Sequence, residues 1–284
     1  MGSISKSYFR PDNLNSALEF LTPEVKVLSG GTDFFPERVG TDFAGKILDI
    51  CSIPELKEIV ETEKYWKIGA TVTWSDIIQK ILPSYFDGLK LAAREIGGVQ
   101  IQNQGTIAGN ICNASPAADA PPVLMTLDAM IEVSSSSETK NIPISDFILG
   151  NRKTCLDPAH LVTAILVPKL KNRTASHFFK LGARRYLVIS IAMVSTVIEI
   201  DQGKIASARL SIGACSPVAK RISDLEKRLQ GSSIENSWEE QVLPDDLAEL
   251  SPIDDIRADA VYRKEAALIM LKRTIKETRM KFFS

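Results

Sequence analysis

Two short segments rich in glycine and other small residues are the parts of this sequence whose residue types suggest binding chemistry. The first is LSGGTD at 28–33, the second is GTIAGN at 105–110, and we expect both to be loops. Adjacent glycines permit positive φ and let the backbone approach a ligand closely, so successive N–H groups can converge on an anion. In the second segment, Thr106 and Asn110 add side chains that can form hydrogen bonds. A Gly-Gly turn between two strands would also explain the first segment without any ligand.

The residues around the second segment are small for a buried part of a protein. Between 105 and 122 (GTIAGNICNASPAADAPP), the only large apolar side chains are Ile107 and Ile111. A core strand or helix would carry more of them, so something other than a side chain is expected to pack against this backbone. Asp119 could accept a hydrogen bond from a ribose or a ring N–H, or it could cap the helix that follows.

Neither segment contains the Gly-Lys-Ser/Thr of a Walker A motif or the GxGxxG of a Rossmann dinucleotide site. Two separate anion-binding segments instead suit an extended ligand with two phosphates, and a dinucleotide is the ligand that we expect. Metal and cluster sites are not expected, because the four cysteines, at 51, 112, 155 and 215, form no CxxC pair and the chain has only two histidines. No set of catalytic residues is expected either.

Length and composition are typical of a globular protein with two packed units. The chain has 284 residues, of which 44% are hydrophobic and 24% charged, and its formal net charge is −1. The near-neutral charge and the lack of a long Lys/Arg run argue against nucleic-acid or anionic-membrane binding. No apolar run is long enough to span a membrane, and the N-terminus lacks the apolar core of a signal peptide. We therefore expect a cytoplasmic protein with no membrane span.

The elements that must hold the two segments follow from the periodicity of apolar residues. A helix is expected at 13–21, and the first segment should connect strands at 25–28 and 46–50. Ser52 should cap a short helix and Thr73 should cap a helix at 74–82. Further elements before residue 170 are a strand at 66–73, a helix at 84–96, a helix starting within 117–129, and strands at 130–135 and 160–167.

The apolar pattern changes near residue 170, where we expect a domain boundary. Strands are predicted at 177–185, 189–201 and 204–215, with a DQGK turn between the second and the third. Helices should follow at 222–230, 236–249 and 258–281. The last of these carries an apolar stripe formed by Ala260, Ala267, Leu268, Leu271 and Ile275. The fold class is therefore α+β, with an antiparallel three-stranded sheet and a helical layer in the C-terminal domain.

Four stretches together resemble one known family. They are LSGGTDFF, GGVQIQNQGTIAGNICNASPAADAPPVL, FFKLGARR and DDIRADAVYRKEAALIMLKRTI. They are similar, in order and over nearly the whole chain, to the FAD-binding medium subunit of molybdenum hydroxylases, such as xanthine, carbon monoxide and nicotinate dehydrogenases. The resemblance implies a two-subdomain FAD-binding domain of the vanillyl-alcohol-oxidase/PCMH type over 1–170, with subdomains at about 1–55 and 56–170. The C-terminal domain of such flavin subunits would then cover 174–284.

The resemblance also implies which residues contact a non-covalently bound FAD. The pyrophosphate and adenosine side would be lined by Val27, Leu28, Ser29, Gly30, Gly31, Thr32, Asp33 and Phe34. The other side of the diphosphate would be lined by Thr106, Ile107, Ala108, Gly109 and Asn110, and Ile96 and Asn113 also belong to the implied set. Near the flavin, Asp119 would form a hydrogen bond, Val162 would pack beside it and Lys180 would approach the ring. Tyr186 could cover the isoalloxazine face, or simply pack at the end of a strand.

As a member of this family the chain would be one link in an electron-transfer complex. A large subunit would carry molybdopterin, a small subunit would carry [2Fe–2S] clusters, and the assembly would be a dimer of heterotrimers. Electrons would pass from the clusters through FAD to an acceptor such as NAD, so that activity requires the partner subunits. Two other readings stay open at this point. One is a free-standing FAD-dependent oxidase or dehydrogenase of the vanillyl-alcohol-oxidase-like class, and the other is a flavin-free scaffold.

The sequence departs from the family pattern at three positions. Gln102 stands where an Arg is usual, and Ala108 replaces a common Gly, which is tolerable if this residue keeps a negative φ. Val188 lies where many relatives carry an Asp near the reactive edge of the flavin. The acceptor is therefore open among NAD, oxygen, a quinone and a protein.

Overall fold

The N-terminal part of the chain forms a small parallel sheet. The computed structural model describes residues 8–40, 43–185 and 187–283. Strands β1 (Tyr8–Phe9), β2 (Val25–Leu28) and β3 (Lys46–Asp49) pair in the order β1-β3-β2. The expected first helix is α1 (Leu14–Phe20), which begins after Asn13 because the Asn13 side chain accepts a hydrogen bond from the Ser16 N–H.

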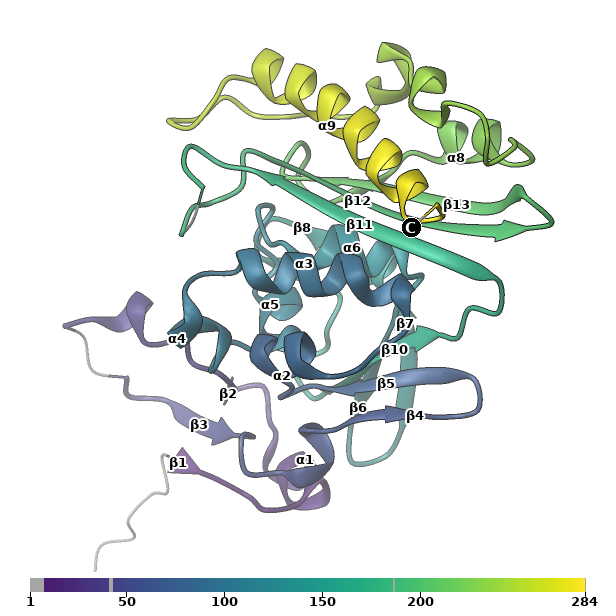
Figure 1. The fold of residues 1–284 in the computed structure, drawn as a ribbon. Coiled ribbons are helices and arrows are strands. Elements are labelled where there is room, and N and C mark those ends of the chain that lie inside the picture. Colours follow the sequence, from purple (N-terminus) through teal and green to yellow (C-terminus); the bar gives the residue numbers. More distant parts are fainter. Residues whose placement is uncertain (1–7, 41–42, 186, 284) are drawn as a thin grey trace, which may run out of the picture.

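A larger antiparallel sheet lies beside this unit (Figure 1). Its strands follow the order β4-β5-β10-β6-β7, and their bounds are Ile59–Glu61, Tyr65–Gly69, Leu161–Pro168, Met130–Ser134 and Thr139–Pro143. The central strand β10 has a continuous apolar run, and all of its residues except the final proline are buried. Such a run is typical of a strand that is covered on both faces.

Several helices lie between this sheet and the C-terminal sheet (Figure 1). They are α2 (Trp74–Gln79), α3 (Asp87–Glu95), α5 (Ile107–Asn113) and α6 (Ala120–Thr126), and the same part of the chain also contains α4 (Val99–Gln102) and α7 (Ile144–Phe147). Helix α2 begins where predicted, since Thr73 forms a capping box with Asp76. Because α3 packs against β11 and α6 packs against β12 and β13, these helices join the two parts of the molecule.

The C-terminal sheet is antiparallel and carries helices on its outer face (Figure 1). Its strands are β11 (Arg173–Leu181), β12 (Ala192–Asp201), β13 (Lys204–Gly213) and β14 (Lys220–Arg221), in that order. The outer helices are α8 (Ser223–Leu229) and α9 (Ala260–Met280). In α9 the predicted apolar stripe is fully buried at Ala267, Leu271 and Ile275, and Leu268 packs partly against the same core.

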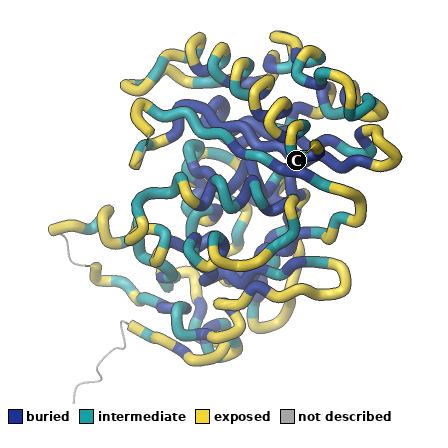
Figure 2. Tube along the Cα trace, in the orientation of Figure 1, coloured by how far each residue is buried: buried dark blue, intermediate teal, exposed yellow. Residues whose placement is uncertain are grey.

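The buried residues form two clusters, which appear in dark blue in Figure 2. One fills the space around the large sheet and its helices, and the other lies between the C-terminal sheet and α8 and α9. The first cluster also includes Phe178, Met193, Val197 and Ala214 of the C-terminal part. The two parts of the chain therefore share a continuous apolar interface.

Some elements differ from the prediction. The C-terminal sheet has the short strand β14 in addition to the three long strands that were expected. The stretch 236–249 contains two 3₁₀ turns, Trp238–Gln241 and Pro244–Leu247, instead of one helix, because proline cannot continue a helix interior. Ser52 does not cap a helix: the local 3₁₀ turn spans Pro54–Leu56, and the Ser52 hydroxyl donates to the Pro11 carbonyl.

Smaller elements were not predicted. They include β1, β4, β7, α4, and the hairpin of β8 (Ile148–Gly150) and β9 (Lys153–Thr154). The predicted helix at 84–96 begins with a 3₁₀ turn, Ser84–Phe86, before α3. Strand β11 starts at Arg173 and ends at Leu181, several residues earlier at both ends than predicted, so the described residues 182–185 and 187–191 lie outside both β11 and β12.

Candidate functional site

The structure brings the two glycine-rich segments into direct contact. The Ser29 hydroxyl lies 3.0 Å from the Thr106 hydroxyl, although the two residues are 77 positions apart. A Cβ atom at Gly30 would lie 1.9 Å from the carbonyl oxygen of Gln104, so only glycine fits between the segments at this position. Gly31 has φ of +71°, which favours glycine as well. The two segments therefore form one continuous backbone surface.

The remaining residues of the first segment follow β2 into a turn. Val27 is half-buried and Leu28 is buried at the end of the strand. Thr32 is half-buried, whereas Asp33 is exposed. The half-buried Phe34 carries the Arg38 guanidinium over its ring, 4.1 Å from the ring centroid, and Arg38 also donates to the Phe34 carbonyl. This part of the site is thus an open turn with an aromatic ring at its end.

The second segment is the start of a helix and not a loop, which corrects the expectation. Helix α5 begins at Ile107 because Thr106 caps it, and the Thr106 hydroxyl accepts a hydrogen bond from the Gly109 N–H. Neither Ala108 nor Gly109 has positive φ. The Ala108 methyl group is therefore accommodated without strain, as the sequence required. Ile107 points into the core, where it is fully buried.

Asn110 provides the observation that points most directly to a ligand. Its amide oxygen is buried and has no hydrogen-bond partner among the described residues. A buried acceptor without a donor is rare in folded proteins and costs free energy unless a ligand or water supplies the donor. Together with the space that Gly30 and Gly31 keep free of side chains, this oxygen fits the polar groups of an extended dinucleotide. Asn113, in contrast, already accepts a hydrogen bond from Arg152 through its side-chain oxygen.

Asp119 and Lys180 form a buried ion pair beside the second segment. The Lys180 Nζ donates to Asp119 Oδ2 at 2.8 Å, and it also donates to the Glu95 carbonyl at 3.2 Å. The Ser190 hydroxyl donates to the other carboxylate oxygen of Asp119 at 2.8 Å. Burial raises the pKa of Asp119, and this effect is opposed by the charge of Lys180 and by the two hydrogen bonds. Asp119 directly precedes α6, but its side chain forms no capping hydrogen bond with the helix. The carboxylate forms the ion pair with Lys180 instead of capping α6.

The remaining predicted site residues lie outside the two glycine-rich segments and the Asp119–Lys180 pair. Ile96 is half-buried and directly follows the last residue of α3, and Gly97 after it has φ of +58°. Val162 is buried in β10 opposite Val133, and β10 packs against α5. Tyr186 lies outside the described residues. The Val188 side chain lies over Gly182, where a Cβ would come within 2.3 Å of the Val188 Cγ1, so an apolar contact occupies this position.

Sequence reasoning missed Ser190 and the carbonyl of Glu95. Ser190 is a buried polar residue between two isoleucines, in a stretch that reads as an ordinary strand. The position of Ser190 between two isoleucines is visible in the sequence. Its partner Asp119, however, lies 71 positions away, and only the fold brings the two residues together.

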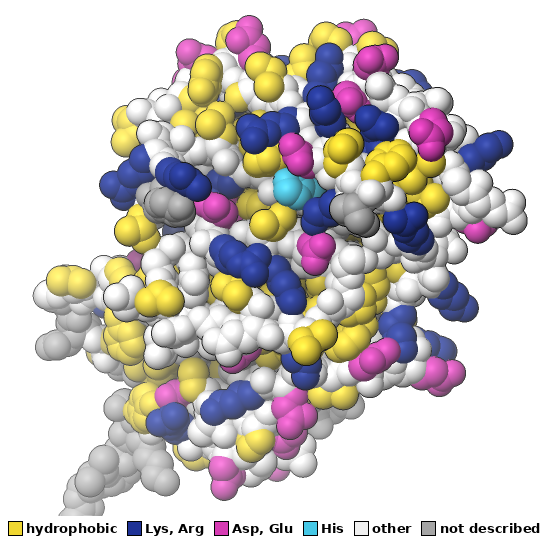
Figure 3. Space-filling model, viewed as in Figure 1, with side chains coloured by type: hydrophobic (Ala, Val, Ile, Leu, Met, Phe, Trp, Pro, Cys, Tyr) yellow, Lys and Arg dark blue, Asp and Glu magenta, His cyan; other side chains and the backbone are white. Residues whose placement is uncertain are grey.

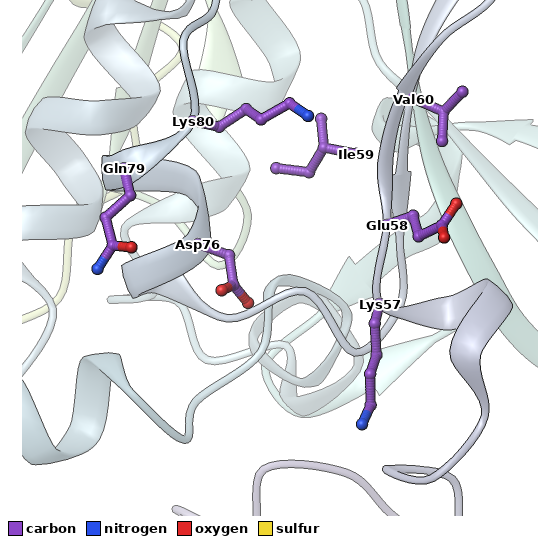
Figure 4. A pocket seen from close by; sticks show the side chains of 7 residues that line it. All are labelled: Lys57, Glu58, Ile59, Val60, Asp76, Gln79 and Lys80. Atoms are coloured by element: carbon purple, nitrogen blue, oxygen red, sulfur yellow. The ribbon is translucent and has the colours of Figure 1, made fainter.

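The described surface includes a hollow away from the candidate site and another beside it. One, of about 530 Å³, lies between α2 and β4, and Figure 4 shows its side chains coming from 57–60 on one side and from Asp76, Gln79 and Lys80 on the other. It contains none of the predicted site residues. The other, of about 550 Å³, lies along the end of β11 and includes Glu95 and Lys180. This second hollow therefore adjoins the candidate site. Basic, acidic and apolar side chains are mixed over the face of the molecule shown in Figure 3.

Two kinds of feature are absent from the described part of the chain. No group of three or more His, Cys, Asp or Glu side chains there could hold a metal ion. No described helix combines the length and apolar character needed to cross a membrane.

Comparison with known proteins identifies relatives that match most of the chain. The model of the FAD binding domain in molybdopterin dehydrogenase matches residues 3–170, and that of the CO dehydrogenase flavoprotein C-terminal domain matches 177–278. The glyceraldehyde dehydrogenase medium chain of Sulfolobus acidocaldarius is 30% identical, covering 95% of this chain and 97% of that protein. The xanthine dehydrogenase FAD-binding subunit of Escherichia coli O157:H7 is 29% identical, covering 95% of each.

Solved structures give the same result. A carbon monoxide dehydrogenase chain from Hydrogenophaga pseudoflava superimposes with a TM-score of 0.86 at 27% identity, covering 95% of this chain and 96% of that one. The reconstituted CO dehydrogenase from Oligotropha carboxidovorans gives a TM-score of 0.88 at 25% identity, with 99% of both chains covered. The chain belongs to the family of FAD-binding medium subunits of molybdenum hydroxylases, the xanthine and carbon monoxide dehydrogenase type of oxidoreductase.

Proposed function

We propose that this chain is the electron-transfer subunit of a molybdenum hydroxylase complex, passing electrons from [2Fe–2S] clusters of a partner subunit through FAD to an acceptor such as NAD. The observation that carries the proposal is the joined surface of the two glycine-rich segments, with the buried and unpartnered Asn110 oxygen beside it. Bound FAD would supply the chemistry, because a flavin can accept single electrons and release a pair. The protein supplies binding, orientation and electrostatics.

Different residues of the chain would contact different parts of FAD. Backbone N–H groups of 29–33 and the surface formed by 106–110 would hold the diphosphate, with Val27, Leu28 and Phe34 on the adenosine side. Within 106–110, the N–H groups of Ile107, Gly109 and Asn110 already donate to Val72 and Thr106, so this segment would contribute mainly through its small side chains and Asn110. Asp119 and Lys180 would meet the polar edge of the ring system. Contacts from Ile96, Asn113, Val162 and Tyr186 complete the proposed set. Binding would be non-covalent, since the two histidines, His160 and His177, lie outside both segments.

We propose an FAD-binding domain of the vanillyl-alcohol-oxidase/PCMH type over 1–170 and a C-terminal domain over 174–284. Subdomains at about 1–55 and 56–170 would correspond to the small parallel sheet and the larger antiparallel sheet. The separate sheets and the second apolar cluster between β12, β13 and the outer helices support this division. Residues of the C-terminal part that belong to the first cluster, such as Phe178, join the two domains.

The partner subunits follow from the kind of protein that the relatives are. Their names describe medium chains and FAD-binding subunits of dehydrogenases, which implies larger assemblies. We propose a molybdopterin-binding large subunit and a [2Fe–2S] small subunit, arranged as a dimer of heterotrimers. Four unpaired cysteines support a reducing compartment, so the cytoplasm is the proposed location.

The acceptor is the least constrained part of the proposal. The family suggests NAD, whereas the apolar packing of Val188 on Gly182 leaves no carboxylate at that position. Oxygen, a quinone or a protein therefore compete with NAD, and acceptor assays on the assembled complex will decide among them.

The binding proposal is tested by the flavin content of the purified chain. We expect one FAD per chain, released intact by acid or heat, and much weaker binding of FMN because both segments contact the diphosphate region. Flavin that stays with the denatured polypeptide would favour the free-standing, tethered oxidase. A chain that binds no flavin under any condition would favour the scaffold.

A further inference from the structure

Three residues from distant parts of the chain meet at Asp119. Asp119 lies just before α6, Lys180 lies near the end of β11, and Ser190 lies in the loop that leads into β12. The two carboxylate oxygens have different partners, because Oδ2 accepts from Lys180 and Oδ1 accepts from Ser190. All three side chains are buried, and Ser190 is only 2% exposed. The cluster spans the interface between the two proposed domains.

The hydrogen-bonding capacity of this cluster is only partly used. An ammonium group has three N–H donors, and those of Lys180 that have partners among the described residues go to Asp119 and the Glu95 carbonyl. A carboxylate offers about four lone-pair positions, and the described partners of Asp119 take two of them. Each group can therefore form a further hydrogen bond with a ligand. The orientation of the carboxylate determines the direction of that hydrogen bond.

We propose that Ser190 is a positioning residue of the flavin site, whose hydroxyl holds the Asp119 carboxylate in the orientation in which Asp119 and Lys180 meet the flavin. This inference rests on the proposed function. A carboxylate that is held only through Oδ2 could rotate about its remaining bond to Lys180. The second hydrogen bond, from a different direction, fixes the plane of the carboxylate and thereby the position of the ammonium group.

Ser190 also helps to keep Asp119 ionised. Burial of a carboxylate favours its neutral form, and a donated hydrogen bond favours the charged form. The charged groups that face Asp119 are Lys180 from β11, which stabilises the carboxylate, and Glu95 from α3, which opposes it. Without the Ser190 hydroxyl, protonation of Asp119 should begin at a higher pH, and an acceptor for the flavin would be lost there.

The fold offers a matched control for this role. Ser195 of β12 is also a fully buried serine, and its hydroxyl lies 2.9 Å from that of Thr126 in α6. It bridges the same two parts of the chain at a point that contains none of the proposed flavin contacts. A general weakening of the interface should follow from either Ser190→Ala or Ser195→Ala, whereas a change in flavin binding should follow only from the first.

The test uses the full-length chain and measures the FAD dissociation constant, the flavin absorption spectrum and the unfolding midpoint between pH 5 and pH 8, a range in which a raised carboxyl pKa becomes visible. Ser190→Ala should weaken FAD binding by about tenfold, the loss expected for one hydrogen bond to a charged group. Its affinity should also start to fall at a higher pH than that of the unmodified chain. Ser190→Thr, which keeps a hydroxyl, should restore affinity relative to Ser190→Ala.

Unchanged affinity, spectrum and pH profile in Ser190→Ala would overturn the inference, and so would an equal change in Ser195→Ala. The decisive comparison is between the two alanine variants, so it stands even if the added methyl group of Ser190→Thr lowers stability. These outcomes are distinct from failure of the proposed function, in which the unmodified chain itself would bind no FAD.

Discussion

At the scale of single residues, the joined surface of the two segments depends on Gly30. The hydrogen atom that replaces a side chain there lets the first segment lie on the carbonyl of Gln104. The cost of the glycine is conformational freedom in the unfolded chain. This loss of conformational entropy on folding is the consequence of a close backbone contact that no larger residue permits.

We predict that Gly30→Ala separates the two segments and weakens FAD binding by about tenfold or more, because overpacking of this kind costs about 1–3 kcal/mol. Gly150→Ala is the matched control, since a Cβ at Gly150 meets no atom within 4 Å and its φ is not positive. Isothermal titration with FAD measures both variants. Full affinity in Gly30→Ala would show that the segments do not form the binding surface.

His177 makes stability depend on pH. Burial, together with the nearby charges of Lys281 and Arg273, lowers the pKa of His177 to about 4, compared with about 6.5 for an unfolded histidine. The unfolded chain therefore binds more protons between these values, so this residue lowers stability as pH falls from about 6.5 to about 4. We predict a loss of about 1 kcal/mol after allowing for solvent screening.

The measurement is the midpoint of urea-induced unfolding at pH 4.5 and at pH 7. The pKa of a histidine in the unfolded chain lies between these two values. His177→Gln should reduce the drop in stability between the two values. An unchanged drop in His177→Gln would assign the acid sensitivity to other groups, such as buried carboxylates.

At the scale of elements, α9 holds the C-terminal sheet together from outside. Leu271 is fully buried in the second apolar cluster, whereas Ile269 on the same helix is 67% exposed. We predict that Leu271→Ala lowers the free energy of unfolding by about 2–5 kcal/mol, the usual cost of removing a buried leucine side chain. Ile269→Ala should change it by less than about 0.5 kcal/mol. Equal effects in urea unfolding would mean that α9 is not packed as described.

Elements with a local signal could be predicted from the sequence. The start of α2 at Thr73 and the apolar face of α9 are set by neighbouring residues, and both were expected. Helix α5 was mistaken for a loop, because its small residues reflect the backbone surface that it must present and not its helical propensity. The stretch 236–249 was mistaken for a single helix, because its apolar spacing hides the break at Pro244.

The site could be predicted only in part, for a similar reason. The two segments are recognisable by composition, so their residues could be named in advance. The contact of Ser29 with Thr106, and the convergence of Asp119, Lys180 and Ser190, depend on tertiary packing between residues far apart in the chain. Sequence spacing carries no information about such contacts, and Ser190 was missed for that reason.

At the scale of the whole molecule, the site draws on both proposed domains. The glycine-rich segments and Asp119 belong to the N-terminal part, whereas Lys180 and Ser190 belong to the C-terminal part. Flavin binding and domain packing should therefore support each other, since a ligand that binds only the assembled state stabilises it.

The measurement that tests the electron-relay function most directly is stopped-flow reduction of the flavin by organic substrates. The FAD-loaded chain alone, and the complex reconstituted with its molybdopterin and [2Fe–2S] subunits, are mixed with purines, N-heterocycles and aldehydes. We predict rapid bleaching of the flavin absorbance only in the complex, and at most weak diaphorase or oxidase turnover by the chain alone. Fast, substrate-driven bleaching in the isolated chain would contradict the relay and identify a free-standing flavoenzyme.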